Sequence, residues 1–208
     1  ANLSSAITAY RLLIDTKAGE SVLHLGGEGS VGQIAAQICE SRGAQAISLV
    51  SPDVLDPEDA VDVLKNLGAT AAAPADFCGN RVFRSVVEAL GRPKLLLIDA
   101  SKYDMMAVNA ILLAAAKGTA SGRKAVEAAD PVDVRDAKVI QTCASLCGDG
   151  AKVLTYNERE GDGALLSVGA ESLNLDEFLD DSTAEMSDFV SQLCGFEYTV
   201  LSEAHDDA

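Results

Sequence analysis

A glycine cluster near the N-terminus has the spacing that suits phosphate binding. Gly27, Gly29 and Gly32 fit the pattern G-x-G-x-x-G. In this pattern the first glycine allows a tight turn, the second lets the backbone approach a pyrophosphate, and the third lets a helix pack closely on a strand. Amides at the start of that helix then face the phosphates. The cluster predicts a dinucleotide-binding loop made by Gly27, Gly29, Ser30, Val31 and Gly32.

Apolar residues on both sides of the glycines predict a strand before them and a helix after them. Residues 21–25 form an apolar run of strand length, and after Gly32 apolar residues recur at the spacing of one helix face as far as Gly43. Strand, tight turn and helix are the context in which the glycine pattern carries meaning. The same glycines would also suit a turn and a packed helix that bind nothing, so retained nucleotide binding stays open.

Strand-like and helix-like segments alternate along most of the chain. This alternation predicts an α/β fold, a doubly wound, Rossmann-type, mostly parallel sheet with helices on both faces. The run at 95–98 is continuously apolar, as expected for a strand covered on both sides. The predicted strands are 21–25, 46–50, 70–73, 95–98 and 151–156, and the predicted helices are 4–16, 31–43, 57–67, 80–90, 105–117 and 137–147.

The ends of the predicted strands locate the rest of the candidate site. In a doubly wound sheet the ligand crevice lies at the carboxyl ends of the strands. Ser51 and Asp53 follow the second predicted strand, and residues 99–102 follow the fourth. We therefore expect Ser51 and Asp53 to lie beside the glycines. Asp53 could bond a ribose hydroxyl. The alternative is that it caps the loop, and its position directly after a proline favours that alternative.

The second half of the chain is less regular, and we interpret residues 1–208 as one domain with two additions. Residues 102–136 form an insertion after the fourth strand, placed to cover the nucleotide site or to make a new contact surface. Residues 157–208 are predicted as an irregular, acidic C-terminal region, in which 193–201 is a candidate last strand.

Charge and composition narrow the class of partner. Of the 208 residues 48% are hydrophobic, which is enough for a full core. Acidic residues outnumber basic ones by 32 to 16, giving a formal net charge of −16. Such a surface repels nucleic acids and anionic lipids, so we expect no nucleic-acid binding, and a basic protein partner suits it better. No apolar run reaches the length of a membrane span, so no membrane insertion is expected.

Side chains capable of acid–base chemistry are present, but their spacing gives them no partner. Asp99, Asp130 and Asp133 are not matched with a histidine or cysteine. Tyr103 lacks a lysine four positions later, because Ala107 stands there. We therefore predict no catalytic residue in this chain.

The histidines and cysteines favour structural roles over metal binding. His24 lies within a predicted buried strand, where a hydrogen-bonded core residue is the favoured interpretation. The chain has five cysteines, scattered and without a C-x-x-C pair. Cys143 and Cys147 share one face of a predicted helix, as two small core residues would. We predict no metal site and a reducing compartment.

Several segments in their order along the chain resemble the cofactor domain of medium-chain dehydrogenase/reductases. The branch that the chain resembles most is the mitochondrial trans-2-enoyl-CoA reductase. The similarity covers residues 1–99 and 137–156. The segments that carry it are Ala6 to Leu13, Val22 to Gln33, Leu64 to Ala69, Pro93 to Asp99 and Gly148 to Tyr156.

The resemblance implies a fold, a cofactor and several departures from the family. Enzymes of this family use NADPH and have a separate barrel-like domain with a catalytic tyrosine, which would lie upstream of Ala1. A basic residue after the second strand holds the 2′-phosphate, whereas this chain has Ser51 and Asp53 there. Glu28 stands inside the glycine turn. At ~6 Å from a phosphate it would cost about 1–3 kcal/mol per charge, unless it is an exposed turn residue that points outward.

Three hypotheses about function follow from these observations. The first is a non-catalytic, enoyl-reductase-like accessory or structural subunit of a larger, mitochondrial protein assembly. Its cofactor is none or NAD(P), and the loss of nucleotide binding is left open. The second is the cofactor-binding part of an NAD(P)H-dependent enoyl-thioester oxidoreductase whose catalytic domain lies elsewhere. The third is a regulatory sensor that binds a nucleotide without reacting it. Titration with NADH and NADPH separates the first from the other two.

Overall fold

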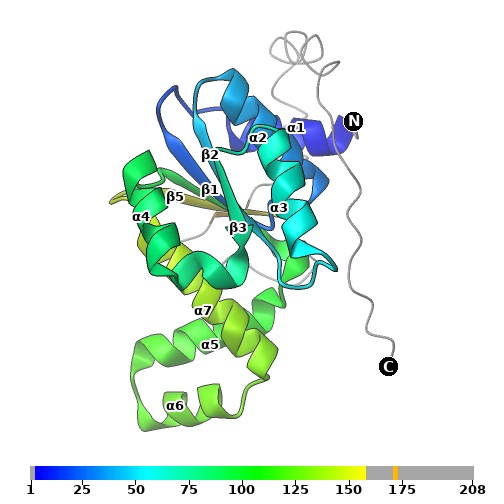
Figure 1. Ribbon diagram of the computed structural model, residues 1–208. Coiled ribbons are helices and arrows are strands. Elements are labelled where there is room, and N and C mark those ends of the chain that lie inside the picture. The colour runs from blue at the N-terminus through cyan, green and yellow to red at the C-terminus, as the bar shows by residue number, and fades with distance from the viewer. Residues whose placement is uncertain (1–2, 158–170, 173–208) are drawn as a thin grey trace.

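The computed structural model describes residues 3–157 and 171–172, which form a six-stranded sheet flanked by helices (Figure 1). All described strand pairs are parallel, in the order β3-β2-β1-β4-β5-β6. The doubly wound sheet predicted from the sequence is therefore confirmed. The strands are β1 (Ser21–Leu25), β2 (Gln45–Val50), β3 (Ala71–Pro74), β4 (Leu95–Asp99), β5 (Lys152–Tyr156) and β6 (Glu171–Ser172).

Helices cover both faces of the sheet. Residues of α1, α2 and α3 pack on one face, and residues of α4, α5 and α7 pack on the other. The α-helices are α1 (Leu3–Leu12), α2 (Ser30–Ser41), α3 (Pro57–Asn66), α4 (Arg81–Leu90), α5 (Met105–Lys117), α6 (Ala120–Glu127) and α7 (Pro131–Leu146), and two 3-10 turns are η1 (Ala75–Gly79) and η2 (Ala100–Lys102).

The central strands are buried on both sides, which explains their continuous apolar sequence. Every residue of β1 and of β4 is buried. Successive side chains point to opposite faces. In β4, Leu95 and Leu97 join the core under α1 and α2, whereas Leu96 and Ile98 join the core under α4 and α7.

The insertion after β4 is more regular than the sequence indicated. Helix α5 has the predicted bounds, but residues 118–136, expected to be irregular, form α6 and the first turn of α7. Capping explains both helices: Thr119 accepts a hydrogen bond from the Gly122 amide, and Asp130 accepts one from the Val132 amide. Pro131 also suits the first position of α7. Helices α5 and α6, with the start of α7, project beyond the sheet (Figure 1).

Parts of the sequence interpretation lie outside the described residues. The acidic stretch and the candidate strand 193–201 are among them, and the single-domain assignment for 1–208 stays a prediction. Of the C-terminal region, Glu171 and Ser172 are described, as a short parallel partner of β5. Over residues 3–157 and 171–172, none of the helices is both long and apolar enough to cross a membrane.

Candidate functional site

Three glycines at the turn between β1 and α2, Gly26, Gly27 and Gly32, sit where a side chain would clash with its surroundings. Gly26 has φ +83°, a backbone conformation that glycine adopts at little cost. A Cβ on Gly27 would lie 2.9 Å from the Cβ of Ser48, and a Cβ on Gly32 would lie 2.3 Å from the Gly27 carbonyl oxygen. The start of α2 is thus pressed against the turn itself, as the glycine pattern predicts.

Helix α2 begins without the side-chain cap that the later helices have. Its N-cap is Gly29, in extended conformation, which has no side chain to bond the amides of the first turn. These amides have no acceptor within the helix, so they are available to an anion. Ser30 bonds Ser5 of α1 through the two hydroxyls at 2.7 Å, and Val31 is buried. The caps of α3 to α7 are Asp56, Asn80, Asp104, Thr119 and Asp130.

Glu28 is turned into the molecule, so the exposed, outward-pointing orientation considered from the sequence is wrong. It is only 4% exposed, and its Oε2 accepts a hydrogen bond of 3.0 Å from the Ser51 amide. The Gln33 side chain fixes the turn by donating to the Glu28 carbonyl oxygen. Oε1 is buried without a hydrogen-bond partner among the described residues. Burial raises the pKa of this carboxyl, while the Ser51 amide and the charge of Lys102 act in the opposite direction.

Ser51 and Asp53 lie at the carboxyl end of β2, close to the glycine turn. Ser51 is buried, and its Oγ accepts a hydrogen bond of 3.4 Å from the Asp53 amide. The Asp53 side chain is 58% exposed, and its Oδ1 lies 3.7 Å from Nη2 of Arg135. The structure thus brings Ser51 to Glu28 and leaves Asp53 on the loop surface.

Arg135 is a residue that the sequence analysis missed. It comes from α7 and reaches the loop after β2, where a basic residue was judged absent. Its Nε donates to Asp136 at 2.9 Å, so two carboxylates hold one guanidinium. The sequence near β2 does not predict the contact of Arg135 with Asp53, because the two residues are far apart along the chain.

Asp99 ends β4 and borders the glycine turn. It is 3% exposed, and its Oδ1 accepts hydrogen bonds from the Ser101 amide, the Ser101 hydroxyl and the Asn157 amide group. Burial raises the pKa of this carboxyl. A Cβ on Gly29 would lie 3.3 Å from Asp99 Oδ2, so the carboxylate borders the turn. These bonds make Asp99 a structural cap of η2.

His24 is a core residue, as predicted. Its Nε2 lies 2.6 Å from the Tyr156 hydroxyl, and the two rings meet edge to face with their centroids 5.6 Å apart. Burial lowers the pKa of His24 to about 3, so the ring is neutral over the physiological range. Tyr103 is also buried, and burial raises its pKa well above the usual value. Neither ring is exposed to a ligand.

The four cysteines among the described residues pack in the interior. Cys39, Cys78, Cys143 and Cys147 are reduced and buried. Cys143, in α7, and Cys147, the C-cap residue after Leu146, both lie in the core, as predicted for two small core residues. Cys147 has extended backbone, so it lies just beyond the helix and not on its face. Within the part of the chain that the structure describes, no group of three or more His, Cys, Asp or Glu side chains could hold a metal ion.

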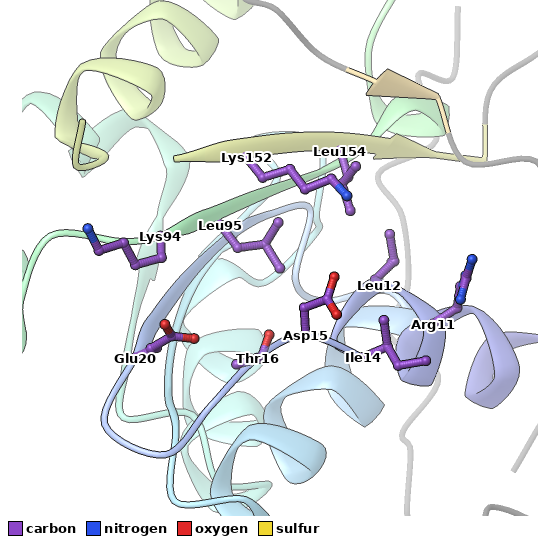
Figure 2. Close-up of a pocket in the computed structure, with 10 residues that line it drawn as sticks. All are labelled: Arg11, Leu12, Ile14, Asp15, Thr16, Glu20, Lys94, Leu95, Lys152 and Leu154. Carbon is purple, nitrogen blue, oxygen red and sulfur yellow. The ribbon is translucent and has the colours of Figure 1, made fainter. Parts of the chain in front are cut away.

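The larger of two described cavities lies at the opposite end of the sheet (Figure 2). It has a volume of about 400 Å³ and lies between the end of α1 and the first residues of β4 and β5. Figure 2 shows the Asp15 and Lys152 side chains directed toward its centre and Lys94 directed away. A smaller cavity of about 270 Å³ lies between α5, α6 and α7. Neither cavity contains a residue of the glycine turn.

Comparison with known proteins gives a related enzyme for part of the chain. No family model matches. A curated protein, the mitochondrial enoyl-[acyl-carrier-protein] reductase of Yarrowia lipolytica, is 35% identical over 92 residues, which are 43% of this chain and 24% of that protein. The aligned residues thus span about a quarter of that relative's length.

Solved structures show the same fold. The mitochondrial 2-enoyl thioester reductase Etr1p/Etr2p heterodimer from Candida tropicalis matches with a TM-score of 0.62 and 18% identity, over 93% of this chain and 48% of that one. The quinone oxidoreductase of Thermus thermophilus, solved also in complex with NADPH, matches with a TM-score of 0.55 and 17% identity, over 95% of this chain and 51% of that one. The resemblance predicted from the sequence is therefore confirmed, and the chain is similar to the cofactor-domain part of medium-chain enoyl reductases.

Proposed function

We propose that this chain is the dinucleotide-binding part of an NAD(P)H-dependent reductase that acts on enoyl thioesters. The observation that carries the proposal is the start of α2, uncapped and pressed onto Gly27 through Gly32. Of helices α2 to α7, this is the one whose first-turn amides meet no side-chain cap. The similarity to a mitochondrial enoyl reductase supports the class of reaction.

The residues of the turn suit a dinucleotide. In this proposal the amides of Ser30, Val31 and Gly32 bond the pyrophosphate, and Gly27 and Gly29 let it approach. Ser51 and Asp53 lie at the end of β2, where the adenosine ribose is held in this fold. When bound, the nicotinamide would supply a hydride to the substrate.

The acid–base side chains considered from the sequence at this part of the sheet, Asp99, His24 and Tyr103, are all buried in the described structure. Asp99 Oδ1 caps η2 and accepts three hydrogen bonds, and His24 bonds the Tyr156 hydroxyl in the core. We therefore propose that the proton donor and most of the thioester site come from another domain or another chain. A reductase assembled in this way needs the cofactor part only to bind and orient the nucleotide.

The proposal includes a place in the cell and a partner. The curated relative is a mitochondrial protein, and the matched reductase from Candida tropicalis is a heterodimer. We propose a mitochondrial location and assembly with other protein subunits. The net charge of −16 favours a basic partner surface.

A second candidate function is a non-catalytic accessory subunit. The buried Glu28 carboxylate favours it, because it brings negative charge to the edge where phosphates would bind. The lobe of α5 to α7 also exposes Met106 and Val132, which an assembly partner would cover. In this alternative the fold is kept as a scaffold and nucleotide binding is lost.

Nucleotide titration distinguishes the two candidates. We expect the protein to bind NADH or NADPH with a dissociation constant in the micromolar range, measured by nicotinamide fluorescence and calorimetry. Ser30→Asp should abolish binding, because it adds a carboxylate beside the pyrophosphate while a negative charge at a helix start favours folding. Ala120→Asp makes a similar change at the start of α6 and should bind normally. Absence of binding at millimolar nucleotide would overturn the proposal and favour the accessory subunit.

A further inference from the structure

The carboxylate of Glu28 lies where this fold holds the adenosine ribose. In dinucleotide-binding folds that site is at the end of the second strand. Here β2 ends at Val50, and the amide of the next residue, Ser51, donates a hydrogen bond of 3.0 Å to Glu28 Oε2. A residue of the glycine turn therefore supplies an acidic group to a place that is usually served by the strand end itself.

The other charged groups around the end of β2 do not offset this carboxylate. Asp53 follows on the loop, and the Arg135 guanidinium that reaches it is already shared with Asp136. Lys102 acts on the Glu28 and Asp99 carboxyls alike. Among the described residues at this edge, carboxylates thus outnumber cations, and the balance opposes an additional phosphate.

The hydrogen-bonding capacity of Glu28 also favours a nucleotide whose ribose carries a free 2′-hydroxyl over one that carries a 2′-phosphate. Its Oε1 is buried without a partner among the described residues. A ribose 2′-hydroxyl can donate to such an oxygen, whereas the oxygens of an ionised 2′-phosphate only accept hydrogen bonds. We propose that Glu28 is the specificity-determining residue of the nucleotide site, and that it selects NAD(H) over NADP(H). This inference rests on the proposed dinucleotide binding, and it sets this chain apart from the matched quinone oxidoreductase, whose complex holds NADPH.

The test compares two nucleotides on three proteins. NADH and NADPH are titrated into the wild type, Glu28→Gln and Glu88→Gln. Glutamine keeps the shape of the side chain and an oxygen that accepts from the Ser51 amide, so charge is the main change. Glu88 is exposed on α4 and serves as the matched control.

The wild type should bind NADH roughly tenfold more tightly than NADPH, as expected for a charge at ~6 Å with an effective dielectric constant of about 20–80. Glu28→Gln should reduce that ratio by roughly tenfold, mainly by tightening NADPH. Glu88→Gln should leave the ratio unchanged.

Each other outcome has a definite meaning. Equal or tighter binding of NADPH by the wild type, or an unchanged ratio in Glu28→Gln, would overturn the inference and leave the proposed function standing. Failure of the wild type to bind either nucleotide would overturn both. If Glu28→Gln does not fold, Asp53→Asn provides the test on an exposed side chain. Asp53→Asn should reduce the preference for NADH over NADPH about twofold to threefold. An unchanged preference in that variant would count against the inference.

Discussion

The two ends of the parallel sheet differ in what they offer a ligand. At the carboxyl end, the glycine turn, the uncapped start of α2 and the buried carboxylates of Glu28 and Asp99 are closely packed. At the amino end, a cavity of about 400 Å³ is lined by side chains such as Arg11, Asp15 and Lys94. Neither of the two described cavities includes a residue of the glycine turn. In this molecule, backbone amides and buried charge identify the candidate site better than volume does.

The buried carboxyl groups explain why the carboxyl end of the sheet, and not the amino end, is the candidate ligand site. Removing a carboxylate from water is costly, which is why the pKa values of Glu28 and Asp99 are raised. Groups with raised pKa values gathered at one edge of a sheet are typical of binding sites. The charged side chains of the amino-end cavity remain largely in contact with water, where their energetic effects are small.

The largest expected effect of a substitution is at Gly32. The variant Gly32→Ala should lower the free energy of unfolding by about 2–3 kcal/mol or more, because the new Cβ meets the backbone of Gly27 at 2.3 Å. Urea denaturation measures this loss. Gly79→Ala is the control, since a Cβ there has open space around it and should change stability by less than ~0.5 kcal/mol. Equal stability of the two variants would show that the close contact is not a constraint.

The next effect is the pH dependence conferred by His24. Its pKa of about 3 in the folded protein is below the ordinary 6.5. The unfolded chain therefore binds the extra proton, and stability that is present above pH 6.5 is lost as the pH falls toward 3. Each pH unit in that window removes about 1.4 kcal/mol. Between pH 7 and pH 5 the wild type should lose about 2 kcal/mol more than His24→Gln.

Urea titrations of the wild type and His24→Gln at several pH values check the predicted pH dependence of stability. The raised pKa values of Glu28 and Asp99 act in the opposite sense, because ionisation of these carboxyls above their ordinary pKa values costs stability in the folded state. Both groups are present in the wild type and in the variant, so the difference between the two curves isolates His24. Parallel curves would contradict the prediction.

A smaller effect is expected at the start of α3. This helix has a side-chain cap, whereas α2 has none. Asp56 accepts a hydrogen bond of 3.0 Å from the Asp59 amide. The variant Asp56→Ala should cost about 1 kcal/mol in thermal or urea denaturation and leave NADH affinity unchanged. A large loss of NADH affinity in this variant would place the nucleotide on α3 instead of α2.

The smallest effects are expected at the amino-end cavity. Lys94 is exposed there, and Lys94→Gln should change the free energy of unfolding by less than ~0.5 kcal/mol. NADH and NADPH titrations should match those of the wild type. A drop in affinity of more than about threefold would assign the cavity to the nucleotide site and remove the contrast between the two ends.

Features that depend on local sequence were predictable. The apolar run of β4, the bounds of α5 and the spacing of the glycines follow from periodicity and turn chemistry, and each agrees with the structure. The start of α7 was placed too late, because Asp130 and Pro131 form a cap and a first turn within a stretch that looked irregular.

Features that depend on distant contacts were not predictable. For Glu28 the sequence left open a carboxylate near the phosphates and an exposed turn residue, because nothing in its neighbours along the chain shows that the Ser51 amide donates a hydrogen bond to it. Arg135 reaches Asp53 only because the fold brings α7 to the loop after β2. Side-chain direction in a turn and contacts across the sheet are set by tertiary packing, so the electrostatics of the site became visible only in three dimensions.

The strand order also has a consequence for how the chain is made. The first strand pairs with β2 on one side and with β4 on the other, where Val22 meets Leu95. On a ribosome β4 emerges only after α2, β2, α3, β3 and α4. At about 5–20 residues per second, one apolar edge of β1 then stays unpaired for several seconds. An open strand edge of this kind is a template for aggregation, so synthesis of this protein passes through a vulnerable period that ends when Leu95 arrives.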